Sequence, residues 1–384
     1  MGLHFSVSKF FCPRFFCSAA AWLRFVSRGL SLLAALLATA APAHAGSKRL
    51  IEFGWDIPDT AFLRAHISQM RQTPFDGCVF QVEYAKPDGA KGNFTWQAWG
   101  RRAFTEAELH DAFTDLRHTR FGKFKYNFLR LNTTPAHLDW FDDHSAVLAN
   151  ATLAAQLARA GRCPGILFDI EQYDGKLFNY HQQRDAATKP WAVYAAQARL
   201  RGREVMQALQ AGYPALTVFL TFGYSLPWGD SNNAKATLAD CNYGLLAPFL
   251  DGMLEAARGG TRFVDGFEHA YAYTTAAEFA AAQQMVKHDL LPIVCDPAKY
   301  HRVFSLGFGL WLDYNSNKRP WDAADVSKNY FSPTAFETTA RAALRATDQY
   351  VWIYSQTPRW WSAAGQPVKL PSEYGAALRE ARRR

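Results

Sequence analysis

The chain has 384 residues, of which 49% are hydrophobic and 20% are charged, as in an ordinary globular protein long enough to form a large core. Its formal net charge is +8, but four of the cations lie in the first 28 residues, and much of the remaining excess lies in the C-terminal tail, which includes Arg379 and Arg382. No basic stripe and no nucleic-acid-binding motif is present, so the composition excludes a nucleic-acid-binding protein.

The first 45 residues are predicted to be a signal peptide. Basic residues precede an apolar run at 30–41, and Ala43-His44-Ala45 matches an A-x-A cleavage site. This run is too short for a comfortable transmembrane helix, and no later stretch is long enough to span a membrane. We expect cleavage after Ala45 and a periplasmic or secreted location in a bacterium. Retention of the segment as an anchor is the alternative.

Four cysteines remain in the mature chain, Cys78, Cys163, Cys241 and Cys295. Their spacing matches neither a disulfide framework nor a zinc pattern. The histidines show no H-x-H or H-E-x-x-H spacing. No metal and no cofactor is therefore expected.

Strand-like and helix-like patterns alternate about eight times along the mature chain. Each expected strand is a short, mostly apolar run, and the helices lie in the longer segments between them. In chain order the strand–helix pairs are 50–57 with 60–72, 77–84 with 106–118, 124–132 with 145–160, 165–171 with 191–210, 216–224 with 243–257, 263–270 with 275–288, 303–313 with 334–345, and 349–355 with 373–382.

This alternation predicts a parallel sheet in an α/β protein. Eight units over about 330 residues fit a (β/α)8 TIM barrel. A doubly wound open sheet is the alternative, but the first strand is not followed by a Gly-rich phosphate turn. No linker divides residues 46–384, so they are predicted to form a single barrel domain. The long loops 86–105, 172–189, 225–242 and 314–331 would lie on its C-terminal face.

The segment Gly165-Ile166-Leu167-Phe168-Asp169-Ile170-Glu171 is the most informative of these strands. Asp169 and Glu171 are two residues apart and would share one face of a strand. An unpaired carboxylate is costly in an apolar setting. Two of them at a strand end therefore indicate a polar site at the mouth of a barrel.

Polar and aromatic residues also end the other strands. A single carboxylate in such a place is usually a helix cap or half of an ion pair, but together they predict an acidic cleft. Aromatic residues make up 15% of the chain, which fits either a large core or a cleft that stacks on sugars. The expected substrate-binding residues are Trp55, Asp56, Glu83, Tyr84, Asn132, Tyr173, Tyr224, His269, Tyr271, Trp311, Tyr354, Trp360 and Trp361.

Two carboxyl groups beside stacking aromatic rings are what glycosidic cleavage requires. Glu171 is the expected general acid, because neighbouring carboxylates raise a carboxyl pKa towards neutrality. Asp169 would orient Glu171 or a substrate group. Alternatively, Asp169 is a structural carboxylate bonded to Arg130 or a tyrosine. Glu268 is the leading partner carboxylate, and Asp313 is the second candidate.

The Asp-x-Glu ending of the fourth strand resembles the signature of barrel glycoside hydrolases of families 18 and 25. The family 18 pattern is matched at Gly165, Asp169 and Glu171, while Pro164 and Leu167 stand where that pattern has two earlier aspartates. The resemblance implies a (β/α)8 fold and a catalytic Glu171. Carboxylates on strands four and six are similarly placed in the α-galactosidase-like clan.

The sequence thus predicts an exported glycoside hydrolase that acts on a poly- or oligosaccharide and binds no nucleic acid. Two alternatives stay open. One is a non-catalytic glycan-binding barrel, and the other is a different barrel hydrolase in which a metal assists the acidic rim.

Overall fold

The computed structural model describes residues 48–315, 318–362 and 370–383. The predicted signal peptide lies outside the described residues. Residues Gly46–Arg384 form one compact unit. Within the described ranges, no helix is both long and apolar enough to cross a membrane.

The unit is built around one parallel sheet that closes on itself. The sheet order is β10-β11-β1-β2-β5-β6-β7-β8-β9, and every neighbouring pair is parallel. β9 and β10 are consecutive parts of one segment, separated only by Gly307, and this segment pairs with β8 on one side and with β11 on the other. The sheet is therefore an eight-membered barrel, and the predicted (β/α)8 fold is confirmed.

The strands of the barrel are short and almost entirely buried. They are β1 (Arg49–Glu52), β2 (Gly77–Phe80), β5 (Phe128–Asn132), β6 (Gly165–Asp169), β7 (Thr217–Leu220), β8 (Arg262–Asp265), β9 (Phe304–Leu306), β10 (Phe308–Trp311) and β11 (Tyr350–Tyr354).

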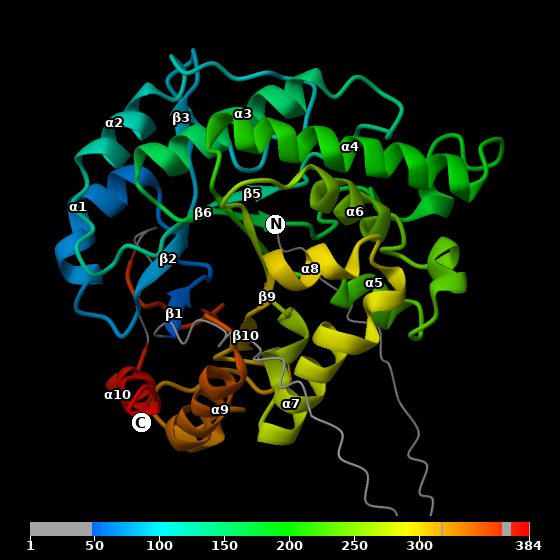
Figure 1. The fold of residues 1–384 in the computed structure, drawn as a ribbon. Helices are drawn as coiled ribbons and strands as arrows, with labels where there is room; N and C mark the ends of the chain where they lie inside the picture. The colour runs from blue at the N-terminus through cyan, green and yellow to red at the C-terminus, as the bar shows by residue number, and fades with distance from the viewer. Residues whose placement is uncertain (1–47, 316–317, 363–369, 384) are drawn as a thin grey trace, which may run out of the picture. The chain divides into compact units, whose positions relative to one another are not determined.

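Helices surround the barrel in Figure 1. They are α1 (Thr60–Met70), α2 (His110–His118), α3 (Ser145–Ala160), α4 (Trp191–Gly212), α5 (Ser225–Asp230), α6 (Leu246–Ala256), α7 (Ala276–Gln284), α8 (Pro297–Val303), α9 (Pro333–Ala346) and α10 (Ser372–Ala381). Strands buried on both faces explain why the sequence shows continuous apolar runs rather than alternation.

The barrel interior is a separate apolar core. It contains side chains from alternate strand positions, namely Ile51, Phe53, Val79, Phe128, Leu167, Phe219, Val264, Tyr350 and Trp352. Since side chains alternate along a strand, residues two positions further on point into the mouth of the barrel at its C-terminal end. Arg130 and Asp169 occupy such positions after Phe128 and Leu167.

Several element boundaries differ from the sequence-based ones. The strand expected at 165–171 ends at Asp169, so Glu171 lies in the following loop rather than on the strand. The strand expected at 263–270 ends at Asp265, and Glu268 begins a short 3-10 helix, Glu268–Ala272. The single strand expected at 303–313 is divided at Gly307 into β9 and β10.

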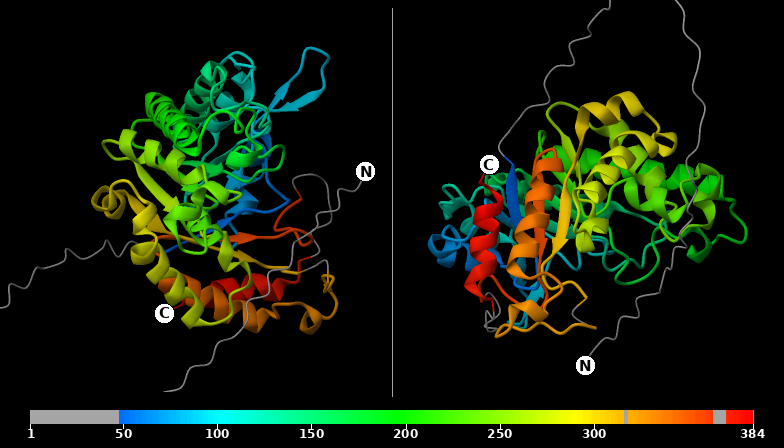
Figure 2. Two further views of the ribbon diagram at one scale, coloured as in Figure 1. Left: turned by 90° about the vertical axis from the view of Figure 1, so that its right-hand side faces the viewer. Right: turned by 90° about the horizontal axis from the view of Figure 1, so that it is seen from below.

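The strand expected at 77–84 ends at Phe80, and its last residues belong to a two-stranded antiparallel hairpin, β3 (Glu83–Ala85) with β4 (Lys91–Asn93), which stands out from the barrel in Figure 2. Helices α5 and α8 have no counterpart in the prediction. Helix α5 lies in the loop expected at 225–242, and α8 precedes β9 and is capped by Asp296, whose side chain accepts from Lys299 N.

Candidate active site

A buried ion pair lies at the carboxyl ends of two neighbouring strands. Asn132 on β5 is in register with Asp169 on β6, which brings Arg130 and Asp169 to adjacent places in the barrel mouth. Arg130 Nε donates to Asp169 Oδ2 at 3.0 Å, and Nη2 donates to the same oxygen. Asp169 is completely buried. The guanidinium therefore compensates a carboxylate that has no access to water.

The guanidinium of Arg130 is also enclosed by aromatic rings. Its carbon Cζ lies 4.7 Å from the ring centroid of Trp96, 5.2 Å from that of Phe53 and 5.6 Å from that of Tyr173. Cation–π contacts of this kind gain strength when water is excluded. Arg130 is thus a fixed cation in the floor of the site.

Glu171 lies two residues beyond the strand and is half-buried. Its backbone N–H donates to Asp169 Oδ1 at 3.2 Å, and its carboxylate accepts a hydrogen bond from the Tyr173 hydroxyl. Burial and the charge of Asp169 raise the pKa of Glu171 to about 7, against the opposing effects of Tyr173 and Arg130. A carboxyl group with this pKa can exchange a proton at neutral pH.

Glu268 is electrostatically coupled to Glu171, although it comes from the loop after β8. Burial, followed by repulsion from Glu171 and Asp169, raises its pKa well above the usual range, and a hydrogen bond from Tyr271 opposes this rise. Like charges that share a site disfavour each other's ionised form, so the charge of Glu171 adds to the effect of burial on Glu268. The structure thus brings together three of the four expected catalytic carboxyls.

Aromatic side chains form a wall beside Glu268. The Tyr271 ring stacks on Tyr354 with centroids 5.5 Å apart, and Trp311 contacts both rings edge-on. Trp55 Nε1 donates to the Tyr354 hydroxyl, while the Trp55 side chain remains 59% exposed. Large aromatic faces left open beside a polar centre are suited to stacking against a ligand.

His269 is next to this wall and is exposed, with its ring 4.9 Å from Phe222. Partial desolvation by neighbouring protein atoms lowers the pKa of the imidazole. It is therefore neutral at pH 7 and can donate or accept a hydrogen bond.

Two of the expected site carboxylates are anchors for the loop after β11. Asp313 Oδ1 accepts from Gln356 N at 2.9 Å and from Trp311 Nε1 at 2.9 Å, while Oδ2 accepts from Thr357 N at 2.8 Å. Asp56 Oδ2 accepts from the backbone N–H groups of the Trp360–Trp361 pair. Both carboxylates are buried, and the backbone N–H groups that they bind compensate for their loss of contact with water.

Four other residues that were expected to bind substrate are instead held by contacts within the protein. Tyr224 is fully buried and donates to Asp251 Oδ1 at 2.9 Å. Tyr84 belongs to strand β3 of the hairpin, is buried, and its hydroxyl donates to Gln97 Oε1 at 2.8 Å. Asn132 is fully buried and its Oδ1 accepts from Thr134 N at 3.1 Å. Glu83 pairs with Lys91 across the β3–β4 hairpin at 2.7 Å.

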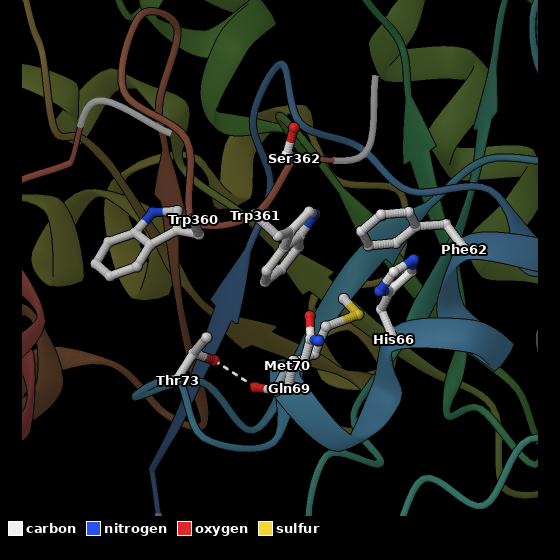
Figure 3. A pocket seen from close by; sticks show the side chains of 8 residues that line it. All are labelled: Phe62, His66, Gln69, Met70, Thr73, Trp360, Trp361 and Ser362. Carbon is white, nitrogen blue, oxygen red and sulfur yellow. Dashed lines mark hydrogen bonds between the residues drawn. The ribbon is translucent and has the colours of Figure 1, made fainter. Parts of the chain in front are cut away.

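Trp360 and Trp361 line a pocket on the outer side of the barrel. This cavity of about 320 Å³ is bounded by Phe62, His66, Gln69, Met70, Thr73, Trp360, Trp361 and Ser362 (Figure 3). Trp361 is 8% exposed and its Nε1 donates to the Asp56 carbonyl oxygen at 2.7 Å. The pocket lies between α1 and the segment after β11, so it is separate from the carboxyl cluster.

Sequence reasoning missed three contributors to the cluster. Trp96 lies in the loop after β4, and Phe53 gave no signal beyond an apolar strand. Phe267 precedes Glu268 with φ of 43°, a left-handed conformation that is rare for a bulky residue and costs about 1–3 kcal/mol. Arg130 was named from the sequence as a possible partner of Asp169, because it is a charged residue inside an apolar strand.

Among the described residues, no group of three or more His, Cys, Asp or Glu side chains is arranged to hold a metal ion.

No protein-family model matches the chain, and no curated protein is similar to it in sequence. The chain is similar to solved structures of glycoside hydrolases. One is a family 5 enzyme of Prevotella bryantii B14, whose structure contains a xyloglucan tetradecasaccharide. It is 9% identical over 83% of this chain and 86% of that chain, with a TM-score of 0.45.

A broad-specificity endoglucanase from an uncultured bacterium is 10% identical, with 83% of each chain covered and a TM-score of 0.45. An endocellulase of the archaeon Pyrococcus horikoshii is 10% identical over 87% of this chain and 91% of that chain, with a TM-score of 0.44.

Proposed function

We propose that the chain is an exported glycoside hydrolase and that Glu171 and Glu268 are its catalytic carboxyls. The observation that carries the proposal is a pair of glutamates with raised carboxyl pKa values in a barrel mouth lined with aromatic rings: burial and Asp169 raise the pKa of Glu171 to about 7, and burial, Glu171 and Asp169 raise that of Glu268 well above its usual range. Glycosidic cleavage needs one protonated and one ionised carboxyl on either side of the scissile bond. Two carboxyls in environments that shift their pKa values differently are suited to these two roles.

The surroundings of the two glutamates favour the proton on Glu268. Glu171 accepts from Tyr173 and lies next to the Arg130–Asp169 ion pair, both of which stabilise its ionised form. Glu268 is more strongly repelled, because both Glu171 and Asp169 raise its pKa. We therefore propose that Glu268 is the general acid and that Glu171 is the nucleophile or base, the reverse of the roles expected from the sequence.

Asp169 is a positioning group in this proposal. Its Oδ2 accepts from Arg130 and its Oδ1 accepts from the backbone N–H of Glu171, and the residue is completely buried, so it does not act on a substrate. This agrees with the structural alternative for Asp169. The exposed ring of Trp55 and the wall of Tyr271, Trp311 and Tyr354 would provide the surfaces on which sugar rings stack.

The test is a reducing-end release screen of the purified chain against bacterial and plant polysaccharides, with Glu171→Gln alongside. We expect release by the wild type and none by the variant, while both unfold at the same urea concentration. Glu83→Gln, in the hairpin, is the matched control and should remain active. If no glycan is cleaved and both proteins bind one equally well, the chain is a glycan-binding barrel and the proposal is wrong.

A further inference from the structure

The backbone turn that carries Glu268 is held in a conformation that its sequence does not favour. Among the described non-glycine residues with positive φ, Arg162, at φ 53°, lies in the turn after α3, away from the carboxyl cluster, and Asn232, Asn233 and Asn315 are of a type that tolerates the left-handed region. Phe267, at φ 43° and ψ 62°, is not, and it is fully buried between β8 and Glu268. Such a conformation persists only where surrounding contacts determine it, and it is typical of functional sites.

Four hydrogen bonds fix this turn. Phe267 N donates to the Asp265 carboxylate at 3.1 Å, Gly266 N donates to Leu220 O at 2.8 Å, and Glu268 N donates to Thr221 O at 3.4 Å. Trp352 Nε1 donates to Gly266 O at 2.8 Å. The backbone on both sides of Glu268 is thus tied to β7 and to the barrel interior.

The carboxylate of Asp265 joins this turn to the loop after β7. Its Oδ1 accepts from Ser225 Oγ at 3.0 Å as well as from Phe267 N, and Oδ2 accepts from Ser225 N at 3.4 Å. Gly223 also donates its N–H to this carboxylate, and a Cβ there would lie 2.4 Å from Oδ2. A single buried carboxylate therefore organises two loops at the barrel mouth.

We propose that Asp265 is a positioning residue for Glu268, which it holds in place by fixing the left-handed turn at Phe267. This inference rests on the proposed function of Glu268. Asp265 itself is fully buried and touches no open surface, so it acts through the backbone rather than on a substrate. A displacement of about 1 Å in a catalytic group can lower kcat by roughly 10²-fold.

The test compares Asp265→Asn and Ser225→Ala with wild type on the substrate found in the release screen. Asparagine keeps an acceptor for Phe267 N but turns an Nδ2 donor towards the N–H groups of Gly223 and Ser225. We expect kcat to fall by roughly 10²-fold for Asp265→Asn and by less for Ser225→Ala, with KM little changed. We also expect the alkaline limb of the pH profile to move to lower pH, because Glu268 moves away from the negative charge of Glu171.

Asp139→Asn is the matched control. Asp139 is also buried and accepts from a tyrosine hydroxyl and from backbone N–H groups, but its partners are Tyr194 on α4, Phe141 and Arg184 and include no residue of the two loops that Asp265 binds. It should leave kcat and the pH profile unchanged. Far-UV circular dichroism and urea unfolding establish that each variant is folded, and Ser225→Ala carries the test if Asp265→Asn does not fold.

The outcomes separate this inference from the proposed function. If Glu268→Gln remains active, the catalytic pair is wrong and the inference falls with it. If Glu268→Gln is inactive but the folded Asp265→Asn and Ser225→Ala variants keep the wild-type kcat and pH profile, the pair stands and the positioning role is refuted. An equal loss in Asp139→Asn would also refute it, because the effect would then be general destabilisation.

Discussion

Replacement of Arg130 by methionine tests how much the buried Arg130–Asp169 ion pair contributes to the free energy of unfolding. Asp169 is completely buried, and the Arg130 side chain is only 10% exposed. Without the guanidinium, Asp169 would keep only the Tyr173 hydroxyl at 3.1 Å and the Glu171 N–H at 3.2 Å. Breaking one partner out of a buried pair costs about 3–5 kcal/mol, because the remaining charge is uncompensated.

The free energy of unfolding is measured in urea at pH 7 for Arg130→Met, Asp169→Asn and the double variant. We expect Arg130→Met to lose about 3–5 kcal/mol, and the double variant to lose clearly less than the sum of the single variants. The control is Arg64→Met. Arg64 is 49% exposed and pairs with Asp115 at 3.2 Å, so its loss should cost less than about 1 kcal/mol.

The same substitution has a predicted effect on the site. Arg130 opposes the rise in the Glu171 pKa, so the pKa of Glu171 should move above about 7 in Arg130→Met. Additive losses in the double variant, or an Arg130→Met loss no larger than that of Arg64→Met, would refute the account of a buried pair.

Three further predictions concern single residues. Burial raises the pKa of Glu52, so the folded state holds its proton more tightly, and the free energy of unfolding should fall as the pH rises above about 4.5; in Glu52→Gln, urea titrations across pH should show a smaller fall, and an unchanged fall would contradict this. Trp55→Ala should raise KM roughly tenfold, a loss of about 1.4 kcal/mol, without a change in urea stability. Gly309→Ala should lose about 1–3 kcal/mol in urea unfolding, because its Cβ would lie 2.6 Å from Trp352 Cζ2, and wild-type stability would contradict this.

The sequence predicted the barrel because its strands are buried on both faces. Continuous apolar runs alternating with helices leave few other architectures. The ends of the elements were less predictable. Strand β6 ends at Asp169, where the chain turns and the Glu171 N–H donates to the Asp169 carboxylate. No pattern of residue types in the sequence indicates this contact.

The candidate site was predictable where polar residues interrupted apolar strands, as at Arg130 and Asp169. It was not predictable where contacts between distant parts of the chain determine which groups a carboxylate binds. Asp56 and Asp313 have the same appearance in the sequence as Glu268, yet backbone N–H groups from the loop after β11 occupy their carboxylates. The left-handed turn at Phe267 could not be foreseen, because the Asp265 contact holds it against local preference.

The exchange of roles between Glu171 and Glu268 is tested most directly by the dependence of cleavage on the leaving group. Aryl glycosides of the sugar found in the release screen are compared for the two glutamine variants. A dinitrophenolate leaves without a proton, so Glu268→Gln should cleave the dinitrophenyl glycoside with a kcat/KM near that of the wild type while failing on the natural glycan. Glu171→Gln should cleave neither. Retained cleavage of the dinitrophenyl glycoside by Glu171→Gln, with loss in Glu268→Gln, would contradict the account.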